Sequence, residues 1–324
     1  MKRLHWLVVC AALSGLIACG DDDGGGTDSG TPGTDGGGGE DGGGGEDAGE
    51  PMVDPPECPS GDNIPDEGGL MGACCYRVSN ADRLANPEFR VSALRITEPT
   101  SLSSALVRGA LNDAIDEERF NWLIRVGGAE MDGAITVETG YGERNMDATF
   151  AFTMGSAPAP GDPDRWNPLT ADATLASETI TTDALSGAFT VPIFEDDLET
   201  LSLELPLQAF ELQMANMSED RSCIGLRDGR VYQTSEGTIR TYIPIADAMA
   251  GRVIIPPIDT TLCNFVAGMA ASSDPCTDTP RADWPVPPNA LCEDGVCTET
   301  CDVADCNAWR IAGGFAAHGV EIAD

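Results

Sequence analysis

Hydrophobic and polar positions alternate most strictly over residues 201–207, where leucine occupies every second position. Such a period of two places one set of side chains on a single face of a β-strand. The apolar set resumes at Phe210, Leu212 and Met214, so its phase shifts near Ala209. One extra residue in a strand produces this shift, and we therefore predict a β-bulge at Ala209.

Shorter stretches with β-branched or aromatic residues, mostly bounded by glycine or proline, also favour strands. The predicted strands span residues 89–96, 135–138, 149–154, 189–194 and 238–243. Pro192 indicates an edge position for the strand that contains it. Between Ile224 and Val231, Asp228-Gly229 predicts a two-residue hairpin because Asp-Gly suits a type I′ turn.

Two stretches have the spacing of helices. The apolar face of the first is formed by Leu102, Leu106, Ala110 and Ile115. Thr100 or Ser101 is expected to cap it, and residues 112–118 supply its polar side. Residues 245–251 predict a short second helix. Because strands dominate, we expect a mainly β fold, a disulfide-stapled β-sandwich or barrel with one or two helices.

The amino terminus has the pattern of an export signal. Met1-Lys2-Arg3 is followed by an apolar run over residues 4–13, which is shorter than the roughly 20 residues that span a bilayer. Leu16-Ile17-Ala18-Cys19 resembles the lipobox of bacterial lipoproteins. The resemblance implies cleavage before Cys19, acylation of Cys19 with fatty acids such as palmitate, and attachment to a membrane. Gly20 rather than aspartate follows the cysteine, which favours the cell outer membrane over inner-membrane retention.

A composition change follows the lipobox. Residues 20–57 hold 15 glycines and 12 acidic residues without a base, so we expect a disordered tether. The predicted organisation is a signal peptide over residues 1–18 and a lipidated cysteine with its tether over 19–57. A β-rich domain over 58–275 and a cysteine-rich segment over 276–324, packed on or next to that domain, complete the chain.

The cysteine count points to disulfides. Of 12 cysteines, Cys10 falls within the signal and Cys19 in the lipobox. The other ten are candidates for disulfides, as expected in an oxidising compartment: Cys58, Cys74, Cys75, Cys223, Cys263, Cys276, Cys292, Cys297, Cys301 and Cys306. The sequence leaves their pairing open, although a bond between the adjacent Cys74 and Cys75 is disfavoured.

Charge excludes several functions. Asp and Glu number 54 against 18 Lys and Arg, for a net charge of -36, which disfavours nucleic-acid binding. With no serine-hydrolase motif and only two histidines, we predict neither catalytic residues nor a metal site. His318, near the end of the chain, is expected at the surface. We expect no cofactor; acidity alone leaves room for weakly bound calcium around Asp162 and Asp164 or within residues 302–305.

Trp166 and Trp284 lie in proline-rich loops and are weak candidates for ligand contact, for example by stacking on a sugar, although packing against proline is the more common use of such residues. Trp122 is expected in the core. The leading interpretation is a lipid-anchored envelope protein, periplasmic or surface-exposed, whose β domain binds or organises an envelope protein or glycan without catalysis. The alternatives are a purely structural partner and a hydrolase that cleaves polysaccharide through paired carboxylates. The densest acidic runs for the latter are 116–118 and 195–197.

Overall fold

The computed structural model describes residues 82, 84–155, 166–184, 187–195, 200–218, 221–225, 227–228, 231–232, 237–255, 258–272, 275–279 and 283–323. The predicted signal peptide, the lipobox and the predicted tether lie outside these residues, as do Cys58, Cys74 and Cys75. No helix in the described part combines the length and the apolar character needed to cross a membrane.

The first half of the described chain contains β1 (Glu88–Glu98), α1 (Ala105–Asp116), β2 (Trp122–Gly127), β3 (Gly133–Arg144), β4 (Phe150–Phe152), β5 (Leu169–Ala176), β6 (Thr179–Thr182), β7 (Ala188–Phe194) and β8 (Leu201–Asn216). The second half contains β9 (Cys223–Ile224), β10 (Arg227–Asp228), β11 (Val231–Tyr232), β12 (Gly237–Pro244), α2 (Ile245–Ala250), β13 (Arg252–Ile255), β14 (Ile258–Thr261), α3 (Leu262–Val266), β15 (Leu291–Glu293), β16 (Val296–Thr298), β17 (Ala308–Gly319) and β18 (Ile322–Ala323). The predicted mainly β fold is confirmed. The helices α1 and α2 were predicted, whereas α3 was not.

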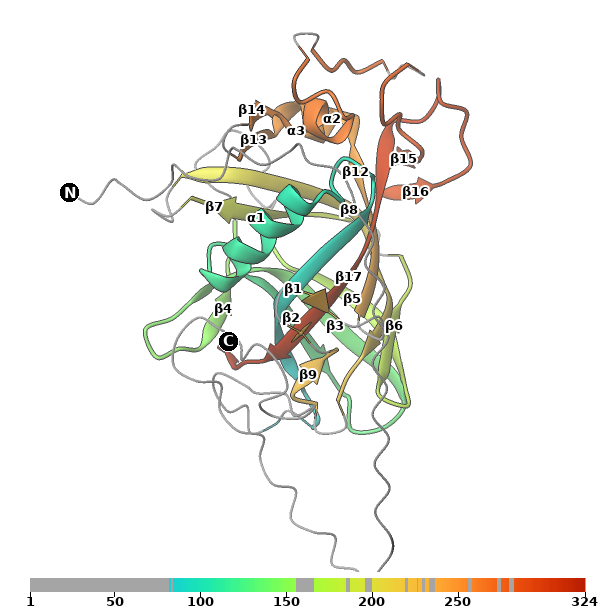
Figure 1. Ribbon diagram of the computed structural model, residues 1–324. Coiled ribbons are helices and arrows are strands. Elements are labelled where there is room, and N and C mark those ends of the chain that lie inside the picture. Colours follow the sequence, from blue (N-terminus) through green and yellow to red (C-terminus); the bar gives the residue numbers. More distant parts are fainter. Residues whose placement is uncertain are drawn as a thin grey trace, which may run out of the picture. The chain divides into compact units, whose positions relative to one another are not determined.

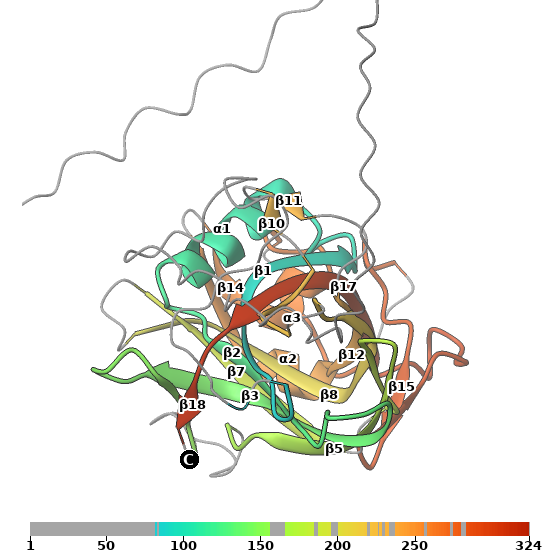
Figure 2. The ribbon, with the colours of Figure 1, turned by 90° about the horizontal axis from the view of Figure 1, so that it is seen from below.

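The main sheet closes on itself. Among the described strands, β12, β17, β1, β2, β3, β5, β6 and β8 follow one another as antiparallel neighbours, and β8 pairs again with β12. Figure 2 shows these strands around a common interior. Eight strands enclose a space that side chains alone can fill. The closed sheet is therefore a barrel whose interior is filled by packed side chains instead of forming an open channel.

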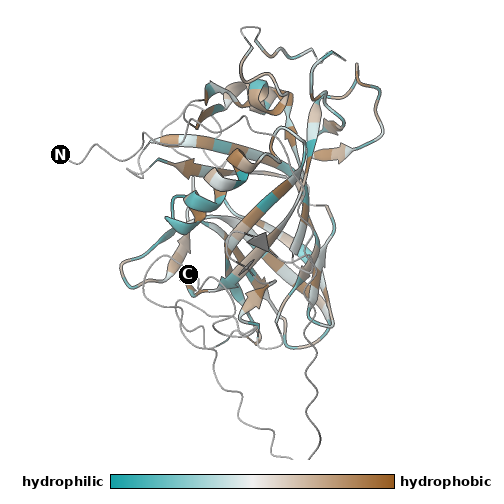
Figure 3. Ribbon diagram, in the orientation of Figure 1, coloured by the Kyte–Doolittle hydropathy of each residue, from teal (hydrophilic) through white to brown (hydrophobic). Residues whose placement is uncertain are grey.

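Apolar side chains from opposite walls meet in this interior. Trp122 of β2 is 3% exposed, which confirms its predicted place in the core, and its ring meets Phe210 of β8 edge-on at 5.4 Å between centroids. Phe89, Ile124 and Phe315 belong to the same buried cluster. Apolar and polar residues succeed each other along the strands in Figure 3, as expected where one face of each strand is buried.

Strand β8 contains the predicted bulge. Ala209 has a left-handed backbone (φ 47°), and the pairing with β12 slips by one residue between Gln208 and Glu211. Before the bulge, β8 pairs with β7 on one edge and with β13 through Leu203 on the other. After it, β8 belongs to the barrel. The bulge thus lies where one long strand passes from an upper sheet, formed with β7, β13 and β14, into the closed sheet (Figure 1).

Helix α1 begins later than predicted, and its buried face coincides only in part with the predicted one. Ser104, rather than Thr100 or Ser101, caps it by accepting the Val107 N–H at 3.2 Å. Leu106 is 50% exposed, whereas Val107 and Leu111 are buried. Leu102, which precedes the helix, and Ile115 are buried as predicted, but the buried face runs through Val107, Leu111 and Ala114 to Ile115 instead of through Leu106.

Asn112 is buried, although it was assigned to the polar side. Its Oδ1 accepts the Leu94 N–H at 3.1 Å and its Nδ2 donates to the Leu94 carbonyl at 2.9 Å. Strand β1 pairs with β2 only through Glu88–Arg90, so this edge of β1 has no strand neighbour at Leu94. The Asn112 amide supplies the two hydrogen bonds that a neighbouring strand would supply.

The observed buried face of α1 predicts that alanine substitutions at two of its leucines have different effects on the free energy of unfolding. We expect Leu111→Ala to lower the free energy of unfolding by about 3 kcal/mol, because the substitution leaves a cavity under the helix. Leu106→Ala, on the exposed side, should cost less than about 1 kcal/mol. Urea denaturation of the two variants measures both values. Equal costs would contradict the observed orientation of α1.

Two features complete the comparison of the fold with its prediction. The hairpin at 227–232 is confirmed, because Arg227 pairs with Tyr232 and Asp228 with Val231; Asp228 therefore belongs to a strand and not to the predicted turn. The main sheet contains strands from both sides of Pro275. Strand β17, from the cysteine-rich segment, lies between β1 and β12 as an integral strand of the barrel, and the described residues on both sides of Pro275 belong to one unit.

Candidate functional site: the cysteine-rich hairpin

The most elaborate polar arrangement in the described part surrounds the hairpin of β15 and β16. Asp294 (φ 50°) and Gly295 (φ 79°) connect the two strands, and positive φ at both residues is the geometry of a type I′ turn. Cys292 and Cys297 lie directly opposite each other in the hairpin and form a disulfide. The turn thus brings the two cysteines into register, and the disulfide closes a hairpin of only three residues per strand.

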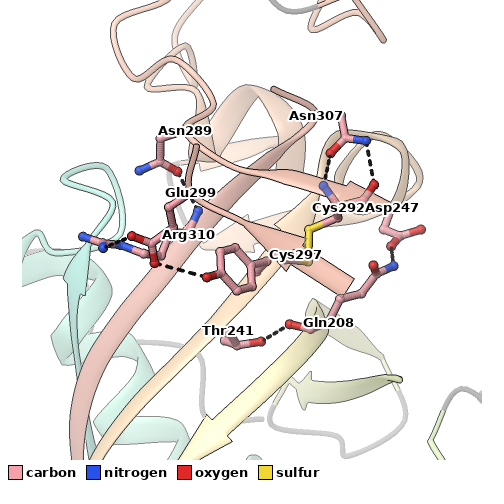
Figure 4. Close-up of a disulfide and its surroundings, with 10 residues drawn as sticks. Gln208, Thr241, Asp247, Asn289, Cys292, Cys297, Glu299, Asn307 and Arg310 are labelled. Carbon is pink, nitrogen blue, oxygen red and sulfur yellow. Dashed lines mark hydrogen bonds and ion pairs between the residues drawn. A yellow bond between two sulfur atoms is a disulfide. The ribbon is translucent and has the colours of Figure 1, made fainter. Parts of the chain in front are cut away.

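The hairpin is held to β17 by an asparagine (Figure 4). Asn307, just before β17, accepts the Cys292 N–H at 2.7 Å through Oδ1 and donates to the Cys292 carbonyl at 2.9 Å through Nδ2. A second disulfide, Cys301–Cys306, closes the loop between β16 and β17. Both ends of this loop are therefore fixed relative to the barrel wall.

Glu299 connects the loop to the outer face of the barrel. Its Oε2 accepts a hydrogen bond from Arg310 at 2.8 Å (Figure 4). Its Oε1 accepts hydrogen bonds from the Tyr242 hydroxyl at 3.1 Å and from the Arg240 guanidinium at 3.4 Å. Arg240 also binds Glu211 of β8, and Arg310 binds Glu98 of β1. One carboxylate in the loop thereby joins a row of charges that crosses β8, β12, β17 and β1; this row and Tyr242 are named the charged seam below.

The pKa shifts in the charged seam favour the protonated forms of its two arginines and of Tyr242, which are the forms that donate hydrogen bonds to the glutamates. The hydrogen bond to Glu211 raises the pKa of Arg240, and the one to Glu98 raises the pKa of Arg310. Burial, and then the charge of Glu299, raises the pKa of Tyr242, so the phenol stays protonated and donates. All three carboxylates accept hydrogen bonds from arginine, so the seam is suited to holding the loop in place rather than to proton transfer.

We expect Glu299→Ala to release the hairpin locally. The loss of free energy of unfolding should be about 1 kcal/mol or less, because the paired side chains are roughly one-third exposed. Amide hydrogen exchange within 291–298 should accelerate, since the loop loses its link to the barrel. Glu293→Ala, an exposed carboxylate of the same hairpin, is the matched control. Identical exchange in both variants would show that the seam does not restrain the hairpin.

The other described cysteines are also bonded. Cys263 of α3 is joined to Cys276, whose N–H donates to Asn264 Oδ1 at 2.6 Å. Cys223 is disulfide-bonded as well. Three complete pairs are thus visible in the described part, and every candidate cysteine that it contains is in a disulfide.

Both tryptophans singled out by the sequence are buried, at 6% exposure. Trp166 lies against Tyr141 and Phe194, with ring centroids 5.4 and 6.2 Å away. Trp284 stacks on Trp309 at 5.9 Å. Their rings are thus covered by other aromatic rings and offer little surface for a ligand to stack on.

The remaining candidates do not converge on one site. His318, expected at the surface, is 3% exposed within β17, so that prediction is wrong; the strand continues almost to the chain end and is covered. In the first acidic run, Glu117 pairs with Arg119 and Glu118 with Arg144. Most of the second run, Cys19, and both Asp162 and Asp164 lie outside the described residues.

The described residues contain no cluster of three or more histidine, cysteine or acidic side chains arranged to hold a metal ion. In the 302–305 segment, the backbone turns back on itself, with the N–H groups of Asp305 and Cys306 donating to the Asp302 carbonyl. The segment is thus a tight turn within the Cys301–Cys306 loop.

Sequence reasoning missed the charged seam. Its members are separated by up to 212 residues, and only the sheet topology makes them neighbours. One local signal was available: Asp294-Gly295 between Cys292 and Cys297 predicts a type I′ hairpin with the cysteines opposed.

The comparisons with known proteins add no relative, since no protein-family model, curated protein or solved structure matches this chain.

Proposed function

We propose that this chain is an exported protein held to the bacterial envelope, at the outer membrane, by lipid on Cys19. Its β domain would bind or organise a protein or glycan there without catalysis. The observation that carries the proposal is the agreement between the lipobox and the disulfides. Disulfides persist in compartments outside the reducing cytosol, and an amino-terminal export signal directs a chain to such a compartment.

We favour binding or support over hydrolysis because of the side chains with which the carboxylates pair. A glycoside hydrolase needs two carboxylates on either side of its substrate, one of them an acid with a raised pKa. In the charged seam, Glu98, Glu211 and Glu299 instead bind arginine. Arg125 likewise pairs with Glu88, whose pKa burial raises, and with Glu138. These pairs hold strands and loops together, which supports a structural use of the acidic residues.

Rigidity supports a role as a scaffold. The barrel interior is filled with side chains, and the hairpin on its outer face is fixed by two disulfides and the charged seam. A surface held in one conformation before binding loses less conformational entropy when a partner docks. The hairpin loop is therefore the part of the described surface that we assign to partner contact.

The anchor is tested by growing cells that express the protein with a labelled fatty acid. Wild-type protein should carry the label and sediment with membranes, because acyl chains contribute about 0.8 kcal/mol per buried methylene. Cys19→Ala should lose all label. Cys10→Ala, within the predicted signal, is the matched control and should keep it. Equal labelling of wild type and Cys19→Ala would refute the anchor.

A further inference from the structure

The disulfide of the β15–β16 hairpin joins two residues that face each other in the sheet. Both backbone groups of Cys292 bond to Asn307, so Cys292 and Cys297 form a pair that exchanges no backbone hydrogen bonds (Figure 4). Side chains lie closest together in pairs of this kind, and the two Cα atoms are 4.0 Å apart. Because Asn307 and the strand pairing do not depend on the sulfur–sulfur bond, they would keep two reduced thiols near enough to bond again.

Cys297 is the accessible end of this bond. It is partly exposed, whereas Cys292 is buried at 8% exposure. In the Cys263–Cys276 disulfide both residues are buried, at 0% and 7% exposure. A thiolate must reach one sulfur atom of a disulfide in order to reduce it. We therefore expect attack on the hairpin disulfide in the folded protein, and protection of the Cys263–Cys276 disulfide.

Charge distinguishes the hairpin disulfide from Cys301–Cys306, in which one residue is also partly exposed. Asp302 and Asp305 lie within that loop, each directly beside one of its cysteines, and both are exposed. Cys297 instead lies between two uncharged residues of β16, and the nearby Glu299 pairs with two arginines. Because the attacking thiolate is an anion, it meets less repulsion at Cys297.

We propose that the Cys292–Cys297 disulfide is a reversible redox switch, which a protein dithiol reduces while the chain stays folded. This proposal rests on the proposed function, which assigns partner contact to the hairpin loop. A thiolate of the dithiol attacks Cys297 Sγ, the sulfur–sulfur bond breaks, and Cys292 leaves as a thiolate that takes a proton. The second thiol of the dithiol then displaces Cys297, which also takes a proton. Two electrons and two protons thus pass to the hairpin, and the dithiol becomes a disulfide.

Reduction would act on the loop through Tyr242. Cys292 belongs to the same buried cluster as Tyr242, and Cys297 packs against that cluster. The Tyr242 hydroxyl in turn donates to Glu299, the carboxylate that links the loop to the barrel. A two-stranded hairpin is only marginally stable alone, so loss of the bond lets β15 and β16 separate more often. The loop would then lose the single conformation that favours docking of a partner.

The test is the order in which the cysteines of the mature, oxidised protein become reduced. The protein is incubated with dithiothreitol, and free thiols are alkylated at timed intervals. The remaining disulfides are then reduced in denaturant and alkylated with an isotopically heavier form of the reagent. Trypsin and a glutamate-specific protease separate the cysteines for mass spectrometry. The fragments that carry them are 253–281, 282–293, 294–299 and 300–310.

Cys292 and Cys297 should acquire the first label together. We expect their reduction to be about tenfold faster than that of Cys263–Cys276 and several-fold faster than that of Cys301–Cys306. Circular dichroism should be unchanged at that stage, and oxidised dithiothreitol should restore the bond once the reduced form is removed. Earlier reduction of Cys301–Cys306, or reduction of all three disulfides at one rate, would overturn the switch.

Amide hydrogen exchange within 291–298 tests the consequence. Exchange should accelerate several-fold when the wild-type hairpin is reduced. The double variant Cys292→Ser with Cys297→Ser should exchange fast with and without the dithiol, whereas Cys301→Ser with Cys306→Ser, the matched control, should keep a change that depends on the dithiol. Unchanged exchange in the reduced wild type would overturn the switch.

The wild-type measurements decide the proposal even if the first double variant does not fold. Absence of a fatty-acid label on a protein whose hairpin disulfide is reduced first would refute only the lipid anchor. A hairpin disulfide that resists the dithiol in labelled protein would refute only the switch.

Discussion

Reduction of the disulfides is expected to lower the thermal unfolding midpoint by about 15–25 °C. Closing a loop removes entropy from the unfolded chain, by about 3 kcal/mol for Cys263–Cys276 and about 2 kcal/mol for each five-residue separation at Cys292–Cys297 and Cys301–Cys306. These three disulfides together contribute about 7 kcal/mol, which is comparable to the whole stability of a typical domain, and reduction of the Cys223 disulfide adds to the loss. About 2–4 °C per kcal/mol applies to domains of 150–250 residues. Circular dichroism melts with and without a phosphine reductant measure the change.

A paired substitution isolates one bond. The double variant Cys301→Ser with Cys306→Ser should lose about 2 kcal/mol and melt about 4–8 °C lower than wild type, while the other disulfides stay intact. If full reduction, verified by thiol titration, left the midpoint unchanged, the disulfides would not be stapling this fold.

Trp122→Ala is expected to cost about 3–5 kcal/mol of unfolding free energy, because it removes the largest side chain of β2 from a packed interior. The substitution also removes the edge-on contact with Phe210 and the hydrogen bond from Trp122 Nε1 to Thr139 Oγ1, which measures 2.7 Å. Guanidinium denaturation followed by circular dichroism avoids the loss of tryptophan fluorescence.

Trp122→Phe is the matched control for this site. It keeps an aromatic ring against Phe210 and loses the hydrogen bond, and Thr139 still donates to the Leu123 carbonyl. We expect a cost of about 1–2 kcal/mol. A loss below about 1 kcal/mol in Trp122→Ala would mean that the barrel interior is not packed around this ring.

The parts of the fold that the sequence predicted are those where a local pattern determines the structure. The leucines of β8 alternate because one face of that strand is buried, and their phase shift located the bulge at Ala209. The pattern fails where small residues replace large ones. Strand β17 reads Ala-Trp-Arg-Ile-Ala-Gly-Gly-Phe-Ala-Ala-His-Gly, and glycine and alanine disfavour strands when judged alone.

Packing explains the small residues of β17. A Cβ placed on Gly313 would lie 2.6 Å from the Arg95 carbonyl oxygen, so a larger residue there would collide with β1. Close packing against β1 thus requires small residues in β17, and these residues do not give the hydrophobic pattern from which a strand is predicted. The same holds for Asn112, whose polarity suggested exposure and whose hydrogen bonds to β1 require burial.

The charged seam could not be predicted from short sequence patterns, for a related reason. Glu98, Glu211, Glu299 and the two arginines become neighbours only through strand order in the closed sheet. No spacing along the chain encodes that order. The cysteines were predicted as a set, and the pairs at 292–297 and 301–306 join near neighbours, whereas no other cysteine lies within 35 residues of Cys223 in the sequence.

The most direct test of the account is the intact mass of the mature protein extracted from membranes. The account predicts a chain that begins at Cys19 and carries acyl groups on that residue, with the cysteines that follow oxidised to disulfides. A chain that begins elsewhere, or that begins at Cys19 without acyl groups, would contradict it.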